Sequence, residues 1–203
     1  MNRWYRATFV ISSFIARTFF SFRVLHSERI PKEGGVILAS NHQSFLDPPL
    51  LGISCPREIY TLARKSLFNW PILGRIFPKI NVVPIEPRAD MSALKIIIRL
   101  VKQGRATAIF PEGSRTFNGE LQPAQPGLGL MIAKTLAPVV PIRIIGAYEA
   151  YPRTKKFPKC HPITIVIGEP IIFTKQDLEA GGRDIYQKLS DQVMARIAEL
   201  EIE

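Results

Sequence analysis

Residues 41–49 read Asn-His-Gln-Ser-Phe-Leu-Asp-Pro-Pro and begin where an apolar run over residues 35–39 has ended. A short apolar run that ends in polar residues is typical of a buried strand. Asp47 before Pro48 predicts a helix start, with the aspartate as N-cap and the proline at the first helical position. We therefore expect His42 to lie in a strand-to-helix turn, with a carboxylate five residues further on.

His42 and Asp47 are candidate partners in general-base catalysis. A neutral imidazole takes a proton from a hydroxyl group only in the right tautomer. A carboxylate on its other nitrogen selects that tautomer and stabilises the imidazolium that forms. The same two residues also suit a purely structural hydrogen bond at the start of a helix. Taken alone, the pair fits either role.

A second stretch, residues 110–115, reads Phe-Pro-Glu-Gly-Ser-Arg and closes the apolar run 106–110. Gly113 lets backbone amides approach a bound anion closely, and Arg115 offers a planar fork of donors that suits a phosphate group. A β-turn that carries a surface arginine is the alternative interpretation of this hexapeptide. The stretch is therefore a candidate anion-binding loop.

Together with a third segment, Val-Val-Pro-Ile at residues 139–142, these two stretches resemble the glycerolipid acyltransferases of the 1-acylglycerol-3-phosphate acyltransferase type. Order and spacing match over about residues 36–148. The resemblance implies transfer of a fatty acyl group from an acyl thioester to the free hydroxyl of 1-acylglycerol-3-phosphate. Phosphatidic acid for phospholipid biosynthesis is the product. His42 is then the general base and Asp47 orients it.

The resemblance also implies which residues bind the glycerol phosphate. Gly113 and Arg115 hold it, Ser114 belongs to the same loop, and Glu112 braces either the loop or the arginine through an ion pair. Arg88 is a further candidate for the same phosphate. In the family an acidic residue is followed at once by arginine, whereas residues 85–88 here read Ile-Glu-Pro-Arg. The arginine therefore comes one residue late.

No Gly-x-Ser-x-Gly segment occurs, so we expect direct transfer without a covalent acyl-enzyme. No bound cofactor and no metal are implied, because three histidines and two cysteines share no ligand spacing. The acyl donor is acyl-CoA or acyl-ACP. Alternatives are transfer to glycerol-3-phosphate, another lysophospholipid or an aminolipid, and a non-enzymatic basic module that binds membranes.

The net charge of +10 predicts an anionic partner, either an anionic membrane surface or an acidic acyl carrier protein. Nucleic acid is not expected as a partner, because the basic residues are spread along the chain and no nucleic-acid motif occurs. The two cysteines, Cys55 and Cys160, lie far apart, which favours a reducing compartment.

Residues 1–27 contain an expected amphipathic helix at the membrane interface. Arg3, Arg6 and Arg17 share one side at 100° per residue, while Trp4 and Ile11 share the other. The longest uncharged stretch is too short to cross a bilayer, which needs about 20 apolar residues. We expect a peripheral or monotopic protein at the cytoplasmic face of the membrane. A helix docked on the protein's own core is the alternative, and both can hold for different faces.

Residues 28–203 are the expected acyltransferase domain, of sufficient length for one core. Strands alternate with helices, which predicts a single α/β domain with a largely parallel central sheet and helices on both faces. The polar loops after the strands then meet at one edge.

Residues 68–74 are expected to cover the core in preference to lining an acyl-chain groove. Residues 151–159 are expected to form an exposed loop, either solvated or anion-binding. The strands are expected at residues 36–39, 58–63, 80–85, 106–110, 139–145 and 163–167.

Overall fold

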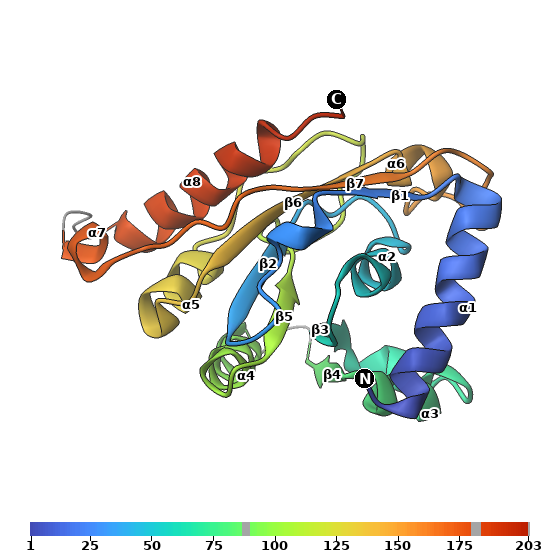
Figure 1. The fold of residues 1–203 in the computed structure, drawn as a ribbon, viewed down its shortest axis with the longest axis horizontal. Helices are drawn as coiled ribbons and strands as arrows, with labels where there is room; N and C mark the ends of the chain where they lie inside the picture. Colours follow the sequence, from blue (N-terminus) through green and yellow to red (C-terminus); the bar gives the residue numbers. More distant parts are fainter. Residues whose placement is uncertain (87–89, 180–183, 203) are drawn as a thin grey trace.

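A computed structural model of the chain describes residues 1–86, 90–179 and 184–202, with the side chains of 90–92 left out. Helices and strands alternate along most of it (Figure 1). The α-helices are α1 Arg3–Phe20, α2 Asp47–Ser54, α3 Leu73–Ile76, α4 Asp90–Lys102, α5 Gly127–Thr135, α6 Ala147–Ala150, α7 Lys175–Glu179 and α8 Ile185–Ala198. The 3-10 helices are η1 Ser27–Arg29, η2 Lys65–Asn69 and η3 Phe77–Ile80. The strands are β1 Arg23–Leu25, β2 Val36–Ser40, β3 Ile59–Arg64, β4 Val82–Ile85, β5 Ala106–Ile109, β6 Val139–Ile145 and β7 Thr164–Ile167.

Within the described residues the strands form one seven-stranded sheet in the order β1-β7-β6-β2-β5-β3-β4. The strands β2 to β6 are parallel to one another. β7 is antiparallel to β6, and β1 lies parallel to β7, so these two run in the opposite direction. The predicted α/β fold with a largely parallel sheet is confirmed.

Helices cover both faces of the sheet, as the sequence predicts (Figure 1). One face packs against α1, α2 and α6, and we call this core the first layer. The other face packs against α4, α5 and α8, and this core is the second layer. The central strand β2 is buried throughout, with Val36 and Leu38 in the first layer and Ile37 and Ala39 in the second. Successive side chains of a strand point to opposite faces, so a strand with two buried faces must be apolar along its whole length.

The strand β1 was not expected from the sequence. It has only three residues, begins with an arginine and starts three residues after the end of the arginine-rich helix, so no alternating pattern marks it. The helix α1 ends where Ser21 adopts a left-handed conformation with φ of 42°. Arg23 then pairs with Thr164 in β7. Pairing with a partner distant in sequence, rather than local propensity, makes this segment a strand.

The expectation that residues 68–74 cover the core is wrong. No residue of η2, α3 or η3 is buried, and Trp70 and Ile72 are 59% and 70% exposed. Phe68 instead packs edge-on against Phe77 of the same segment, with 5.3 Å between ring centroids. The segment forms a local cluster outside the two main cores.

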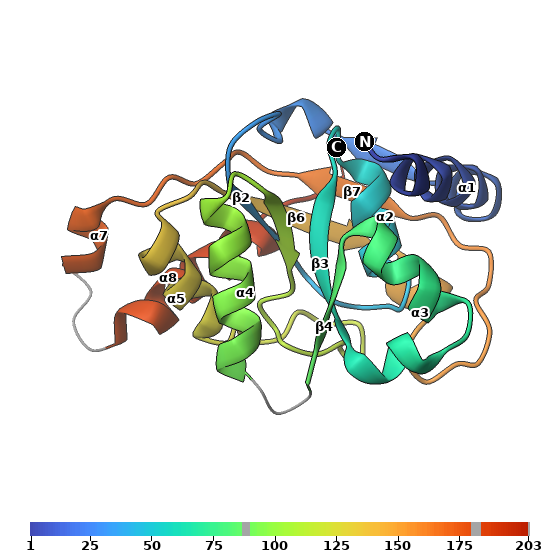
Figure 2. The ribbon, with the colours of Figure 1, turned by 90° about the horizontal axis from the view of Figure 1, so that it is seen from below.

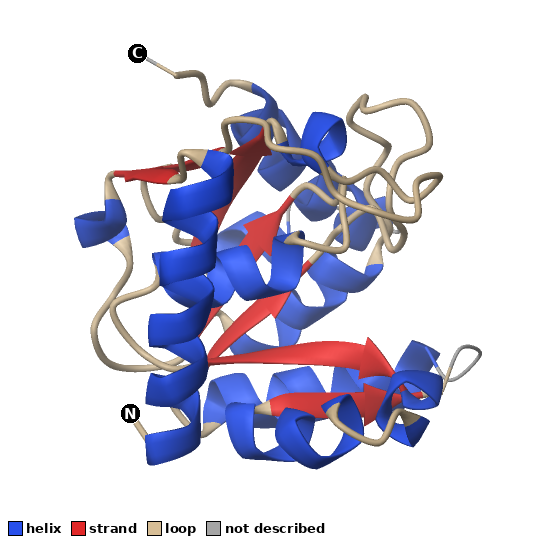
Figure 3. Ribbon diagram, turned by 90° about the vertical axis from the view of Figure 1, so that its right-hand side faces the viewer, coloured by secondary structure: helices blue, strands red, loops and turns tan. Residues whose placement is uncertain are grey.

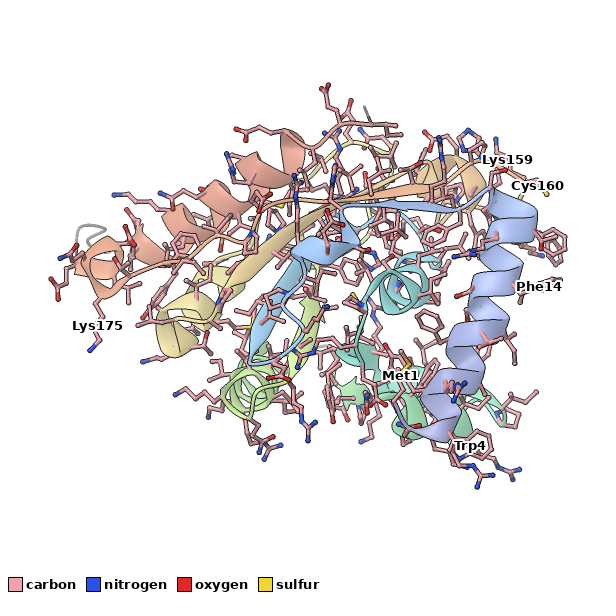
Figure 4. All side chains as sticks on the ribbon, viewed as in Figure 1. Met1, Trp4, Phe14, Lys159, Cys160 and Lys175 are labelled. Carbon is pink, nitrogen blue, oxygen red and sulfur yellow. The ribbon has the colours of Figure 1, made fainter. Side chains whose placement is uncertain are left out.

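The helix α1 docks on the protein and also presents apolar side chains to solvent. Ala16 and Phe20 are buried in the first layer, where α1 lies beside α2. Tyr5 is also buried, and its hydroxyl accepts from the N–H group of Ile59 at 3.2 Å. Its outward face is apolar and exposed, with Phe14 pointing away from the sheet (Figure 4). The exposed large apolar residues of this face are Val10, Ile11, Phe14, Ile15 and Phe19. In the described parts of the chain, no helix combines the length and apolarity needed to cross a bilayer.

The parallel strands end at one edge of the sheet, which lies at the bottom of Figure 2. In Figure 3 most of the strand arrows point to the same side, toward a group of long loops. The loops after β2, β3, β5 and β6 start at this edge. It is the place where ligands bind in open α/β sheets.

Candidate active site

His42 and Asp47 form a hydrogen-bonded pair at this edge. Nδ1 of His42 lies 2.7 Å from Oδ2 of Asp47, whose side chain is fully buried. The same oxygen accepts hydrogen bonds of 2.7 Å from the backbone N–H groups of Gln43 and Ser44. The predicted N-cap role of Asp47 is wrong, because the helix begins at Asp47 itself and Leu46 is the capping residue. The carboxylate folds back over the preceding turn, which fixes both the turn and the imidazole.

Asn41 fastens this turn to the sheet. Its side chain is fully buried, with Nδ2 donating to the carbonyl of Ile144 at 2.9 Å. Its Oδ1 accepts from the N–H group of Ile144 at 2.7 Å. The side-chain amide thus uses one of its N–H donors and its oxygen to continue the pairing between β2 and β6. The residue before the histidine has a structural role, which sequence analysis alone did not assign.

The imidazole of His42 stacks on the ring of Phe110, with 3.9 Å between ring centroids and 14° between planes. Phe110 directly follows β5. Nδ1 is committed to Asp47, and no hydrogen bond from Nε2 ends on another described residue. The pair is thus held on two sides, and Nε2 is the nitrogen available to a substrate.

Glu112 is buried, and its carboxylate joins two backbone segments. Oε1 accepts from the N–H group of His42 at 2.8 Å, and Oε2 accepts from that of Gln122 at 3.2 Å. The sequence left open whether Glu112 braces the loop or pairs with Arg115. Within the described residues it forms no ion pair with Arg115, and its contacts are the two backbone hydrogen bonds. Burial raises the pKa of Glu112 to about 7, against the lowering effect of the two backbone hydrogen bonds.

Gly113 and Ser114 form the exposed tip of the loop after β5. Gly113 has a φ of 72°, a conformation that residues with a side chain rarely adopt. Its own N–H group donates to the carbonyl of Phe110 at 3.0 Å and closes the turn. No hydrogen bond from the backbone N–H of Ser114 or Arg115 ends on another described residue. Those two amides are therefore available to an anion.

The Arg115 guanidinium lies flat on the ring of Phe45, with Cζ 3.5 Å from the ring centroid. Its Nη1 is buried and has no hydrogen-bond partner among the described residues. Burial lowers the pKa of Arg115, and the charges of Arg153 and Arg64 lower it further, while Asp47 raises it. A cation with an unused buried donor beside other cations is the environment that an anionic ligand stabilises.

Arg64 and Arg153 were not among the candidates from sequence. Arg64 is the last residue of β3, and Arg153 lies in the loop beyond β6. Nη1 of Arg153 donates to the carbonyl of Arg115 at 3.1 Å, and its guanidinium lies 4.0 Å from the centroid of the Phe117 ring. Arg64 follows a predicted parallel strand, and its place at the carboxyl end of that strand could have marked it as a candidate. Arg153 lies in the loop of residues 151–159, for which the sequence left solvation and anion binding open.

The remaining candidate, Arg88, lies outside the described residues. Across the described ranges no three His, Cys, Asp or Glu side chains gather in a way that could hold a metal ion. The described site consists of a histidine–aspartate pair, a buried glutamate that positions it and an arginine loop beside it. Such a site can remove a proton from a hydroxyl group while binding an anion.

The fold and this pair define an α/β protein with a hydrogen-bonded histidine–aspartate pair at the carboxyl edge of a largely parallel sheet. The sequence matches the family model described as Acyltransferase over residues 21–145. The chain belongs to this acyltransferase family.

Relatives agree with this assignment. A 1-acyl-sn-glycerol-3-phosphate acyltransferase of Brassica napus, BAT2, chloroplastic, is 33% identical over 167 residues, which cover 80% of this chain and 45% of that protein. The 1-acyl-sn-glycerol-3-phosphate acyltransferase of Bacillus subtilis is 30% identical over 151 residues, 73% of each chain. The chain thus spans less than half of the Brassica protein's length and most of the Bacillus protein's length.

A solved structure shares the fold. It is that of the 1-acyl-sn-glycerophosphate acyltransferase PlsC from Thermotoga maritima, with a TM-score of 0.73 and 23% sequence identity. The match covers 95% of this chain and 80% of that chain. The likeness therefore extends well beyond the central sheet.

Proposed function

We propose that this protein transfers a fatty acyl group from an acyl thioester to the free hydroxyl of 1-acylglycerol-3-phosphate, forming phosphatidic acid. The observation that carries the proposal is the His42–Asp47 pair at 2.7 Å, with Nε2 open beside the cationic loop at Arg115. The relatives from Brassica napus and Bacillus subtilis carry the name of this activity.

In the proposed reaction Nε2 of His42 takes the proton of the acceptor hydroxyl as its oxygen attacks the thioester carbonyl carbon. The new ester C–O bond forms and the C–S bond breaks. The imidazolium returns its proton to the departing thiolate, so the histidine ends neutral. Asp47 holds Nδ1–H and stabilises the imidazolium, and the stacked Phe110 ring keeps the imidazole in one plane.

Arg115 is the proposed partner of the acceptor's phosphate. Its unpaired Nη1 and the N–H groups of Ser114 and Arg115 can donate to phosphate oxygens. Arg64 and Arg153 add positive charge around it. Arg88 remains a candidate for the same phosphate from sequence alone. A phosphate monoester with nearly two charges suits this group of cations better than a choline diester.

The donor is proposed to be acyl-CoA or acyl-ACP, both of which present an acyl thioester on an anionic carrier. The net charge of +10 supports either carrier. Measuring kcat/KM with the same acyl chain on coenzyme A and on acyl carrier protein identifies the donor. A preference of about tenfold or more in kcat/KM corresponds to about 1.4 kcal/mol and decides it.

The proposed location is the cytoplasmic face of the membrane, as a peripheral or monotopic protein. The outward face of α1 supports this, because Val10, Ile11 and Phe14 are 60%, 60% and 70% exposed. Arg3, Arg6 and Arg17 are exposed on the same helix and suit anionic headgroups. The exposed Trp70 is a further apolar candidate for the lipid interface.

Turnover of a labelled acyl thioester by His42→Ala tests the proposed chemistry. A loss of about two to four orders of magnitude is expected. His161→Ala is the matched control and should leave turnover unchanged, because within the described residues the imidazole of His161 hydrogen-bonds only to the carbonyl of its neighbour Pro162. Turnover of His42→Ala equal to wild type would remove the mechanism. A panel of lysophosphatidic acid, glycerol-3-phosphate, lysophosphatidylcholine and an aminolipid then identifies the acceptor.

A further inference from the structure

The loop between α6 and β7 carries three lysines that the proposed chemistry does not use. We call residues 151–159 the basic loop. It contains Arg153, Lys155, Lys156 and Lys159 and no acidic residue. Its three lysines are exposed, and in the described part of the chain none of their side chains forms an ion pair. This charge is therefore available to an external anionic partner.

Phe157 protrudes from the basic loop. It is 80% exposed, more than any other exposed large apolar side chain of the described residues. It lies among the lysines, so a partner of this loop must accept an aromatic ring and several cations at adjacent positions. The headgroup region of an anionic lipid bilayer has both properties, because anionic groups lie directly above acyl chains.

The basic loop is held in shape by its own hydrogen bonds. The Tyr151 hydroxyl donates to the carbonyl of Lys156 at 3.0 Å, and the N–H group of Lys159 donates to the carbonyl of Ala150 at 2.8 Å. The N–H group of Lys155 donates to the carbonyl of Pro152 at 3.1 Å. Phe157 is thus presented by a closed loop, which reduces the conformational entropy lost on binding.

The basic loop is fastened to the site. Ser44 Oγ donates to the carbonyl of Tyr151 at 2.7 Å, and the ring of Tyr151 lies 5.5 Å from that of Phe45. Arg153 donates to the carbonyl of Arg115. The chain beyond the loop reaches the end of α1, where Ile163 N–H donates to the carbonyl of Phe20 at 2.8 Å.

The basic loop and α1 also lie on the same side of the molecule. Lys159 and Cys160 lie next to the upper end of α1, and Phe14 projects outward from the same helix (Figure 4). In Figure 3, which views the molecule from that side, both α1 and the loops face the viewer. The helices α4 and α8 lie on the other side of the sheet (Figure 1).

We propose that the basic loop is a second contact with anionic lipid, which acts together with α1 and holds the edge of the sheet that carries His42 against the bilayer. Lysine side chains bind lipid phosphates, and Phe157 enters the interface. The inference rests on the proposed membrane location and not on the acyltransferase chemistry. The basic loop would thus be a membrane contact next to the site, in addition to the contact that α1 supplies.

Sedimentation with vesicles tests the inference on the full chain. Vesicles of phosphatidylcholine alone are compared with vesicles of phosphatidylcholine and phosphatidylglycerol. The variant Lys155→Gln/Lys156→Gln/Lys159→Gln should bind the anionic vesicles at least about tenfold more weakly than wild type. Phe157→Ser should weaken binding about fivefold. Both variants should keep the melting temperature of wild type, since these side chains are exposed.

Matched variants on the opposite side provide the control. Lys95→Gln/Arg99→Gln/Lys102→Gln removes the same charge from the exposed side of α4, and Ile172→Ser removes an apolar side chain that is 61% exposed. Both should bind as wild type does. Equal weakening by the two charge variants would show that only net charge matters and would overturn the proposal.

Two further outcomes decide between partners. Unchanged vesicle binding by the loop variant, with lost retention on immobilised acyl carrier protein, would overturn the proposal and assign the loop to an acidic protein. Failure of wild type to bind any vesicle would overturn the membrane location together with the loop. Turnover of soluble short-chain substrates is unaffected in either case, so a failed acyltransferase assay is recognised separately.

Discussion

The backbone N–H group of His42 donates a hydrogen bond of 2.8 Å to Oε1 of Glu112, which joins the turn after β2 to the loop after β5. The second oxygen of this carboxylate accepts from the N–H group of Gln122. Both oxygens of a buried side chain are therefore used to hold backbone. The position of the proposed base depends on a residue that belongs to the candidate anion-binding loop.

We expect Glu112→Gln to lower kcat about tenfold to hundredfold with little change in KM for the donor. An amide has one acceptor oxygen, and its NH₂ group would face the second backbone N–H donor, so one segment must shift. Steady-state kinetics with both substrates measures this. Glu120→Gln is the control. Its carboxylate is exposed, so this variant should behave as wild type. Unchanged kcat with a raised acceptor KM would instead place Glu112 in substrate binding.

The stability of the protein should depend on pH through Glu112. Burial raises its pKa to about 7, above the ordinary value of 4.5, so the folded state binds the proton more tightly than the unfolded state. The associated stabilisation is complete below about pH 4.5 and is lost as pH rises through about 7. Melting temperatures across this range should show a decline in wild type that Glu112→Gln lacks. Parallel curves for the two proteins would contradict this.

The proposed catalytic contacts show what a sequence can and cannot predict. The pairing of His42 with Asp47 was predictable, because both lie in one short turn and their spacing fixes their distance. Gly113 and Arg115 were placed in the same site because parallel strands end at one edge. These inferences need only local pattern and the rule for parallel sheets.

Other contacts depend on packing between distant segments and could not be read from local pattern. Arg153 reaches Arg115 from a loop whose course depends on the antiparallel strand β7. The strand β1 exists only because β7 offers it an edge. Trp70 is exposed although its residue type favours burial, since its segment packs on itself. Tertiary context decides each of these.

Asp47→Asn should reduce both activity and stability, whereas His42→Ala should reduce activity alone. Oδ2 of Asp47 accepts three hydrogen bonds in a fully buried position, and Oδ1 has no hydrogen-bond partner among the described residues. An asparagine that keeps its oxygen on the three donors therefore buries an unpaired NH₂ group, and the opposite orientation breaks all three bonds. The expected cost is about 1–3 kcal/mol of the free energy of unfolding. Urea denaturation of both variants measures it. Equal stability of the two would mean that the turn does not depend on this carboxylate.

The outward face of α1 should bind membranes without supporting the fold. Ile11→Ser/Phe14→Ser should lower vesicle binding about tenfold or more, because two exposed apolar side chains no longer enter the interface. Its melting temperature should stay near that of wild type. Phe20→Ser is the matched comparison, since Phe20 is buried against the first layer and its loss should destabilise the fold by about 3 kcal/mol. Destabilisation by the double variant would assign the outward face to packing.

Arg115→Lys should raise KM for lysophosphatidic acid about tenfold to hundredfold and change the donor KM much less. Lysine keeps the charge but loses the fork of donors, and it also loses the flat contact in which Cζ lies 3.5 Å from the Phe45 ring centroid. Phe45→Leu should therefore produce a smaller change in the same direction, because the arginine is then less well oriented. Lysophosphatidylcholine should be a poor acceptor for wild type, since its phosphate diester carries one charge beside a bulky cation. Both Michaelis constants are measured for each variant. A raised constant for the donor would place Arg115 in the carrier site. A preference of wild type for lysophosphatidylcholine would contradict the phosphate pocket.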